Sequence, residues 1–202
     1  MRPGRPRSSP DTWGLRQAWH LVGGSVFPLL ALVASRQTVL LGLALAGAVF
    51  GAVDVLRLGS ASVSAWTSQH IPMLREEERH RPTGSTYFVA GALVVFLVFD
   101  TSIAANAVLI QAVADPAAAV VGSRWGRHRW KRKSLEGSLA YLVAAIAAGS
   151  VLLPTYLGLG LPLLALAALV AAAFEFLPLP VDDNLRVPVL TAVVLATAQA
   201  IF

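Results

Sequence analysis

Apolar residues are gathered into seven segments along the chain, and short polar stretches separate them. A helix needs roughly 17–25 predominantly apolar residues to cross a bilayer, and each segment is near this length. The segments cover residues 15–34, 38–56, 87–99 (or 83–99), 102–121, 139–153, 157–177 and 185–202. The pattern therefore predicts an all-α, polytopic membrane helix bundle of about seven transmembrane helices.

The composition supports a membrane protein. Hydrophobic residues make up 56% of the 202 residues and charged residues only 13%, whereas soluble domains average about 25% charged residues. The chain has no cysteine, so neither disulfides nor thiolate chemistry is available to it. We expect residues 1–14 to form a disordered basic arm and residues 15–202 to form a single transmembrane domain.

The basic residues are distributed unequally between the two sides of the predicted bundle. If the N-terminus is cytoplasmic, the inner side holds the N-terminal arm and loops 57–84, 122–138 and 178–186. Together with Arg16 at the inner end of the first segment, these regions carry 15 of the 16 lysines and arginines, and only Arg36 lies outside. Because cytoplasmic loops are enriched in basic residues, we predict a cytoplasmic N-terminus in a cell (inner or plasma) membrane. No nucleic-acid partner is expected, and the sequence does not define an oligomeric state.

Asp115 stands in an apolar run, and glycines and basic residues follow it. An ionised carboxylate within or at the edge of a bilayer is costly and by default marks a functional site. Carboxylates hold Mg²⁺, glycines let backbone approach a ligand closely, and a basic run neutralises phosphates. The residues concerned are Asp115, Gly122, Arg124, Gly126, Arg127, Arg129, Lys131, Arg132 and Lys133. Together they predict a nucleotide-phosphate site at the membrane surface.

The same stretch also has structural interpretations. Asp115 and Pro116 suit a helix start, and a helix restarting at Pro116 would direct backbone N–H groups towards a bound anion. That interpretation is compatible with a site. Gly122 and Gly126 could form a helix-packing motif, but the charges from Arg124 onwards favour a phosphate-facing turn.

Two polar clusters precede this region. Asp54 and Arg57 lie three residues apart on one helix face, and they fit a structural ion pair as well as they fit a site. The segment 74–84, which contains Arg75 and Glu78, is most simply a solvated loop whose charges pair with one another.

Other polar residues lie near the two ends of the chain. Asp182 and Asp183 precede the last apolar segment, and they fit either a helix N-cap or a pair of Mg²⁺ ligands. Arg16 and His20 are one helical turn apart near the start of the first segment, where a histidine is usually an interfacial residue. Glu175 lies in the sixth segment, and the sequence suggests no role for it.

Two blocks of sequence resemble a known family. They are Asp115-Pro-Ala-Ala-Ala-Val-Val-Gly122-Ser-Arg-Trp-Gly126 and Lys133-Ser134-Leu135-Glu136-Gly137-Ser138. Further matching patterns are Arg75…Glu78…Thr83-Gly84, Asp54-x-x-Arg57 and Asp182-Asp183-Asn184…Pro188. Over most of the chain between Arg16 and Pro188, these motifs resemble the polyprenol kinase family, which includes dolichol kinase, phytol kinase and CTP-dependent diacylglycerol kinase. The sequence departs from the family at Gln17, where a lysine is frequent.

The resemblance implies a kinase that uses CTP and Mg²⁺ to phosphorylate a membrane-embedded lipid alcohol (polyprenol, dolichol or phytol). Asp115, Asp183 and Lys133 would be catalytic. Asp115, with Asp182 or Asp183, would hold Mg²⁺, and the remaining acid of that pair would orient the lipid hydroxyl. The residues implied in CTP binding are Arg75, Glu78, Gly122, Arg124, Gly126, Arg127, Arg129, Lys133, Ser134, Glu136 and Gly137. The candidates for contact with the lipid are Arg16, His20, Asp54 and Arg57.

Three alternatives stay open. A CTP-dependent diacylglycerol kinase would make phosphatidic acid, and a CTP-using cytidylyltransferase would use a similar site but release pyrophosphate. A small-solute transporter would place polar groups near the midplane of repeated, broken helices, whereas here they collect on one face. An isoprenoid alcohol is favoured over diacylglycerol because the apolar segments offer no further polar cluster to bind a glycerol ester.

Overall fold

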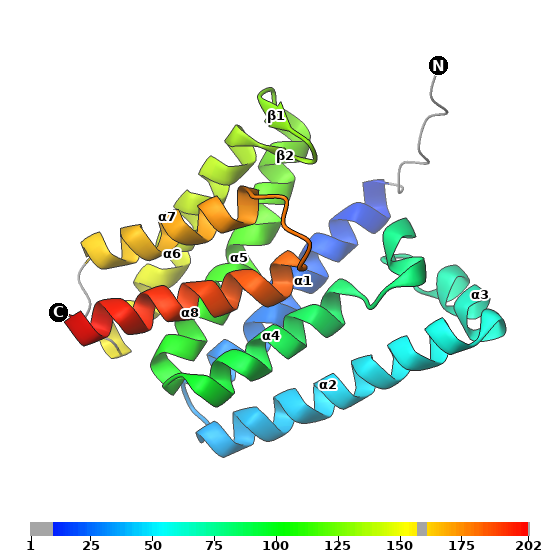
Figure 1. The fold of residues 1–202 in the computed structure, drawn as a ribbon, viewed down its shortest axis with the longest axis horizontal. Helices are drawn as coiled ribbons and strands as arrows, with labels where there is room; N and C mark the ends of the chain where they lie inside the picture. The colour runs from blue at the N-terminus through cyan, green and yellow to red at the C-terminus, as the bar shows by residue number, and fades with distance from the viewer. Residues whose placement is uncertain (1–9, 157–160, 202) are drawn as a thin grey trace.

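Each of the seven apolar segments forms a helix. The computed structural model describes residues 10–156 and 161–201 (Figure 1), so residues 157–160 of the sixth predicted segment lie outside the described residues. In chain order the elements are α1 (Pro10–Leu30), α2 (Arg36–Gly59), α3 (Ala61–His70), the 3-10 helix η1 (Glu76–His80), α4 (Gly84–Val98), α5 (Thr101–Trp125), β1 (Arg129–Trp130), β2 (Lys133–Ser134), α6 (Leu135–Tyr156), α7 (Leu161–Phe176) and α8 (Asp183–Ile201). The predicted fold class, an all-α membrane helix bundle, is confirmed.

α5 is the central helix of the bundle. In its most apolar stretch 72% of the residues are buried, against 17% in α2. The helices α1, α4, α6 and α8 all contact it, whereas α2 lies along one edge (Figure 1) and exposes Leu41, Leu45 and Val49. Apolar side chains on an outer helix face suit contact with lipid, and the buried centre is left for α5.

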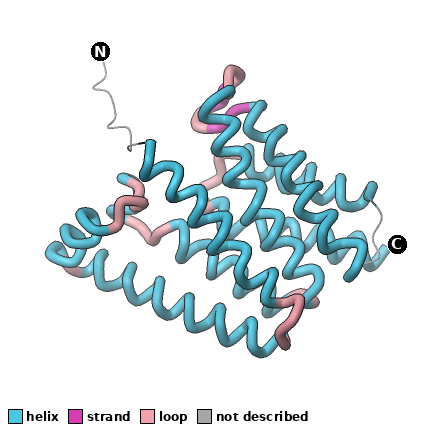
Figure 2. Tube along the Cα trace, turned by 180° about the vertical axis from the view of Figure 1, so that it is seen from behind, coloured by secondary structure: helices cyan, strands magenta, loops and turns pink. Residues whose placement is uncertain are grey.

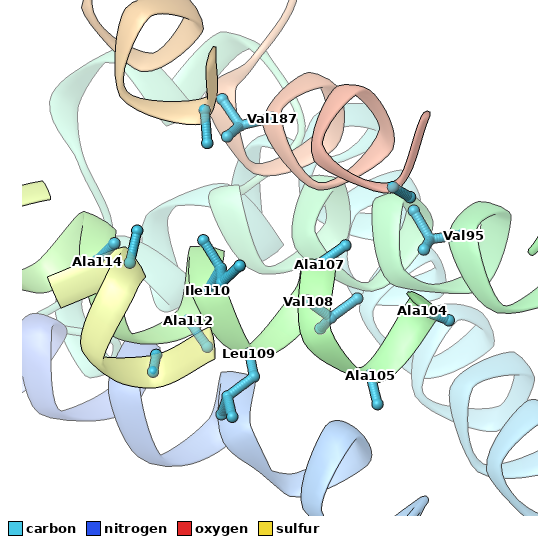
Figure 3. Close-up of a cluster of buried hydrophobic side chains, with 14 of the residues drawn as sticks. Val95, Ala104, Ala105, Ala107, Val108, Leu109, Ile110, Ala112, Ala114 and Val187 are labelled. Carbon is cyan, nitrogen blue, oxygen red and sulfur yellow. The ribbon is translucent and has the colours of Figure 1, made fainter. Parts of the chain in front are cut away.

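Small side chains form much of the core around α5. Ala104, Ala107 and Ala112 are fully buried, and Figure 3 shows that the side chains of this helix point in several directions, with Leu109 directed towards α1. Small residues let helix backbones approach closely, which matters in a bilayer because lipid tails are as apolar as the side chains. α7 contributes a similar buried set, Ala167, Ala168, Ala171 and Ala172.

The expectation that a helix restarts at Pro116 is wrong. α5 runs without interruption from Thr101 to Trp125, with Asp115 and Pro116 inside it. A proline within a helix removes one backbone hydrogen bond, but neighbouring groups in a helix bundle can compensate for this loss. Asp115 is therefore not an N-cap, and Pro116 does not provide a helix N-terminus for anion binding.

Several short elements were not predicted. α3 and η1 lie within the 57–84 stretch, which the sequence analysis treats as loop, and β1 and β2 form an antiparallel hairpin within the 122–138 loop. α1 begins at Pro10, inside the 1–14 segment that was expected to be disordered. Residues 1–9 of that segment lie outside the described residues.

The polar connections gather at one end of the bundle. The hairpin, the 71–83 connection and the start of α1 lie at this end, while the α4–α5 connection and the end of α8 lie at the other (Figures 1 and 2). An ion pair between Arg132 of the hairpin and Glu77 of η1 joins two of these connections. We call this the polar end.

By length and composition, three of the described helices could each cross a membrane: α2, α5 and α8. The helices α4, α6 and α7 are apolar but shorter. Seven spans and a cytoplasmic polar end therefore remain predictions from the hydrophobic pattern and the charge distribution.

The orientation can be tested with single cysteines, because the native chain contains none. We expect Glu77→Cys and Arg129→Cys to react with a membrane-impermeant maleimide only after the cells are permeabilised, because fifteen of the 16 basic residues lie on the predicted inner side. Asp100→Cys, at the opposite end, should react in intact cells. Labelling of the Arg129→Cys protein in intact cells would contradict the predicted topology.

Candidate functional site

The β1–β2 hairpin carries Lys133 over the polar end. Trp130 pairs with Lys133 across the hairpin, and Lys131 takes a left-handed conformation in the turn (φ 53°). The guanidinium of Arg129 donates to the carbonyl oxygen of Gly122 (2.7 Å) near the C-terminal end of α5, where a cation is electrostatically favourable. Arg129, which the resemblance implies in CTP binding, is thus engaged in holding the hairpin on α5.

Lys133 bridges two carboxylates from different helices. Its Nζ donates to Asp183 Oδ2 (2.6 Å) and to Glu175 Oε1. Burial opposes the charge of Lys133, but the carboxylates of Glu175, Asp183 and Asp115 together outweigh it and raise the pKa of the amine above its usual value. The ammonium is therefore charged at physiological pH. We call these four residues the Lys133 cluster.

The two aspartates before α8 have different roles. Asp182 Oδ1 accepts the backbone N–H of Asn184 (3.1 Å), which is a helix-capping contact, and burial raises the pKa of the Asp182 carboxyl group. Asp183 turns to Lys133 and also pairs with Arg186 (2.5 Å). Asp182 therefore caps α8 and Asp183 belongs to the Lys133 cluster, while Mg²⁺ binding by these acids stays a prediction.

Asp115 faces α1 from the middle of α5. Its Oδ2 lies 3.9 Å from His20 Nε2, and that buried nitrogen has no hydrogen-bond partner among the described residues. The His20 ring meets the Phe88 ring edge-on, with 5.1 Å between centroids. Arg16, one turn earlier, lies within electrostatic range of both Asp115 and Arg75. The fold thus brings the Arg16 guanidinium and an imidazole nitrogen without a hydrogen-bond partner around Asp115.

Gly122 and Gly137 mark a close contact between α5 and α6. A Cβ atom on Gly137 would lie 3.3 Å from Gly122 Cα, and one on Gly126 would lie 2.6 Å from Ser134 Oγ. Ser134 is itself buried, and its hydroxyl accepts the backbone N–H of Gly137 (3.1 Å). Helix packing, which the sequence analysis ranked below a phosphate-facing turn, therefore explains these glycines, and Ser134 caps α6.

Of the remaining residues predicted to bind the nucleotide, two have exposed side chains that can contact it, and one is hydrogen-bonded within the protein. Arg124 and Arg127 are exposed at the end of α5. Glu136 instead accepts the backbone N–H of His128 (3.1 Å) and contacts the ring Nδ1 of the same residue (2.7 Å). It therefore closes the base of the hairpin.

Asp54 and Arg57 form a structural ion pair. Their side chains are 5% and 1% exposed, and Asp54 Oδ1 accepts from Arg57 Nε (2.7 Å). The other Asp54 oxygen accepts the backbone N–H of Thr83 (2.8 Å) and the hydroxyl of Thr86 (2.6 Å). Arg57 also donates to the carbonyl of Glu78 (2.5 Å). The two residues clamp α2 to the start of α4, which leaves them no free group for a lipid substrate.

Glu78 and Arg75 differ in burial and in the number of their contacts. Glu78 is buried, and its carboxylate accepts the backbone N–H groups of Arg75 (2.8 Å) and Gly84 (2.9 Å). It therefore shapes the 75–84 segment. The Arg75 side chain is 34% exposed, and its Nε lies 3.9 Å from Glu78 Oε1. It also lies within electrostatic range of Asp182, so its guanidinium is loosely paired and partly open to solvent.

Two contacts at this end were missed by sequence reasoning. Glu77 receives both terminal nitrogens of Arg132 (2.7 Å for Nη1), and Glu175 pairs with Lys133. The charged segment 75–81 contains several acidic residues, and its sequence does not show which of them pairs with a residue of a distant loop. The only signal for Glu175 was its position as a lone carboxylate within an apolar segment, which is costly and by default functional.

The carboxylates of the Lys133 cluster suit a Mg²⁺ site that is completed by water and substrate phosphates. Among the described residues, no group of three or more His, Asp or Glu side chains could hold a metal ion by itself. Mg²⁺, however, usually takes one or two carboxylates and completes its shell with water and substrate phosphates. Asp115 and Asp183 therefore fit a metal ion that arrives with a phosphate ligand.

The sequence is similar to those of curated lipid kinases. It is 33% identical over 97 residues to the CTP-dependent diacylglycerol kinase 1 of Schizosaccharomyces pombe, a match that covers 46% of this chain and 44% of that protein. It is 32% identical over 154 residues to the phytol kinase of Synechocystis, covering 71% of this chain and 66% of that protein. The chain thus matches less than two thirds of either relative's length. No protein-family model matches the chain, and no solved structure matches it.

The structural role of the Asp54–Arg57 pair can be tested by unfolding. Asp54→Asn leaves a buried guanidinium without its counter-charge, so we expect the free energy of unfolding in detergent micelles to fall by about 3 kcal/mol. Glu76→Gln is the matched control. It breaks the exposed Glu76–Arg79 pair and should change stability by less than about 0.5 kcal/mol. Equal stability of the two variants would show that the clamp is dispensable.

Proposed function

Because this chain belongs to the lipid kinase family that includes phytol kinase and CTP-dependent diacylglycerol kinase, we propose that it transfers the γ-phosphoryl group of CTP to a lipid alcohol in the membrane. The observation that carries the proposal is the Lys133 cluster. The Lys133 ammonium contacts the carboxylates of Glu175 and Asp183 at the polar end, and Asp115 lies within electrostatic range of it. Such a cluster suits phosphoryl transfer, which depends mainly on positioning and charge neutralisation.

The triphosphate would lie between the cluster and the basic groups around it. Lys133 and Arg75 have partly exposed charged groups, and Arg16 lies within electrostatic range of Arg75. These two arginines repel each other although the carboxylates of Asp115, Glu78 and Glu77 lie nearby, and a phosphate group would add to this compensation. Arg124 and Arg127 would extend the basic surface along the end of α5.

Asp115 and Asp183 would hold Mg²⁺, which would neutralise charge on the transferring phosphoryl group. Asp115 is fixed in the central helix, so its carboxylate would provide a rigid reference point for the reacting groups. Asp183 is paired with Lys133 and Arg186, and those contacts hold its carboxylate in place at the start of α8. The two acids thus come from different helices, as a site formed between helices requires.

The lipid hydroxyl would lie beside His20. The unpartnered Nε2 of this residue is 3.9 Å from Asp115, so a hydroxyl within about 2.8 Å of the nitrogen would also be beside the carboxylate. This placement replaces the earlier expectation for the 182–183 pair, because Asp182 caps α8 and Asp183 is paired. The lipid chain would follow the outer face of α1, where Trp19, Val22 and Val26 are exposed.

We favour an isoprenoid alcohol such as a polyprenol or phytol as the acceptor. The match to the phytol kinase extends over 154 residues, whereas the match to the diacylglycerol kinase extends over 97. The other buried charged pair of the described helices, Asp54–Arg57, is closed by its own contacts and has no free group for a glycerol ester. Diacylglycerol remains the alternative acceptor.

A product assay tests donor and acceptor together. The purified protein in mixed micelles should transfer labelled γ-phosphate from CTP to phytol or a polyprenol, and ATP should be a poor donor. Label found only in phosphatidic acid would reverse the choice of lipid. Release of pyrophosphate would indicate a cytidylyltransferase, and binding without turnover would favour a transporter.

Asp115→Asn tests the assignment of the central carboxylate. We expect turnover to fall by a factor of about 10²–10³, because a neutral amide cannot balance Mg²⁺ and removal of one such contact typically costs several kcal/mol in the barrier. Asp100→Asn is the matched control, since Asp100 precedes the opposite end of the same helix. If Asp115→Asn keeps normal turnover in the kinase assay, Asp115 does not contribute to the site.

A further inference from the structure

Glu175 is a buried acidic residue that has no role in the proposed reaction. Its side chain is 3% exposed, although it lies in the apolar helix α7. A buried carboxylate is costly unless it is paired and hydrogen-bonded. Glu175 has two such partners: Oε1 receives Lys133 Nζ, and Oε2 lies 3.5 Å from the Ser138 hydroxyl of α6.

The two carboxylate partners of Lys133 differ in their access to solvent. The side chain of Asp183 is 26% exposed, against 3% for Glu175. Asp183 also has a second cation, Arg186, at 2.5 Å. A ligand that approaches from solvent can therefore reach Asp183 and Lys133, whereas Glu175 lies behind them.

The end of α7 is fastened close to Glu175. Arg186 of α8 donates to the carbonyl oxygen of Leu177 (2.7 Å) and to that of Phe174, so the last turn of α7 is tied to α8. The same guanidinium reaches Asp183. Glu175 therefore has a fixed backbone as well as a buried side chain.

We propose that Glu175 is the positioning residue for Lys133: it is the permanent partner of the ammonium, and Asp183 is the partner that Lys133 exchanges for a phosphate oxygen when the nucleotide binds. This inference rests on the proposed function. Lysine carries a point charge on a flexible four-carbon stem, so it needs an anchor to present that charge in one place. Arg186 keeps Asp183 paired after the exchange, which leaves the aspartate oriented towards the metal and phosphate.

The test compares nucleotide affinity with turnover. Glu175→Gln keeps the shape of the side chain but removes its charge, so Lys133 should turn fully to Asp183 and be withdrawn from the nucleotide. We expect the KM for CTP, and the Kd for a non-hydrolysable CTP analogue, to rise about 10–100-fold, the usual effect of losing a residue that orients a ligand-binding group. The kcat should change by less than about threefold. Asp183→Asn should show the opposite pattern, with near-normal affinity and a large loss of kcat.

A double-mutant cycle separates positioning from a general structural role. If Glu175 acts through Lys133, then Glu175→Gln should add little to the loss of CTP affinity already caused by Lys133→Met. Asp54→Asn is the matched control, a buried carboxylate of a structural ion pair, and it should lower stability without changing the KM for CTP. Glu175→Asp keeps the negative charge but places it one methylene further from Lys133, so it should recover part of the CTP affinity lost in Glu175→Gln. It also serves as the probe if Glu175→Gln does not fold.

Two results would overturn the inference. One is unchanged CTP affinity in Glu175→Gln, and the other is a full additional loss in the double mutant. If the wild-type protein phosphorylates a lipid alcohol, either result contradicts this inference and leaves the proposed function intact. A wild-type protein that does not bind CTP contradicts the proposed function, and this inference with it.

Discussion

The polar end of the bundle depends on the balance between the Lys133 ammonium and the carboxylates of Glu175 and Asp183. An ionised group in apolar surroundings loses most of its hydration, so it persists only where opposite charge and hydrogen bonds replace the water. Removing Lys133 would leave Glu175 without a cation, and removing either carboxylate would leave Lys133 with a single partner. Because the three residues come from the hairpin, α7 and α8, the same charge balance also fixes where these elements meet.

Buried hydrogen bonds couple the helices that carry the site. The Tyr141 hydroxyl donates to Gln111 Oε1 (2.7 Å), Gln111 Nε2 donates to Asn184 Oδ1 (3.5 Å), and Asn184 Nδ2 donates to the carbonyl of Gly84 (3.3 Å). This chain of contacts links α6, α5, α8 and α4. A satisfied buried network makes a core rigid. The two aspartates assigned to Mg²⁺, one on α5 and one on α8, are therefore held in relation to each other by more than packing.

Many residues of the family-like motifs stabilise the fold and do not face a ligand. Asp54 and Arg57 clamp α2 to the start of α4, Glu78 shapes the segment before α4, and Arg129 fastens the hairpin to α5. The glycines of the motif allow α5 and α6 to approach each other. Polar groups remain available around Asp115 and Lys133, where they are partly exposed or unpartnered. The motifs that carry the family resemblance thus include residues that hold the scaffold together as well as the residues proposed to bind ligands.

The sequence by itself determined the fold class, the position of every long helix and the collection of basic residues at one end. These properties follow from local composition, since the length of an apolar run and the charge of a loop do not depend on distant partners. It did not reveal α3, which is short and polar, or the hairpin, whose strands have two residues each. The tertiary structure decided which charges pair: Lys133 with Glu175, 42 residues away, and Arg132 with Glu77, 55 residues away. It also decided that α5 continues through Asp115 and Pro116, because a packed helix bundle can tolerate the hydrogen bond that proline removes. Pairing and burial are properties of the packed bundle, and no local pattern in the chain records them.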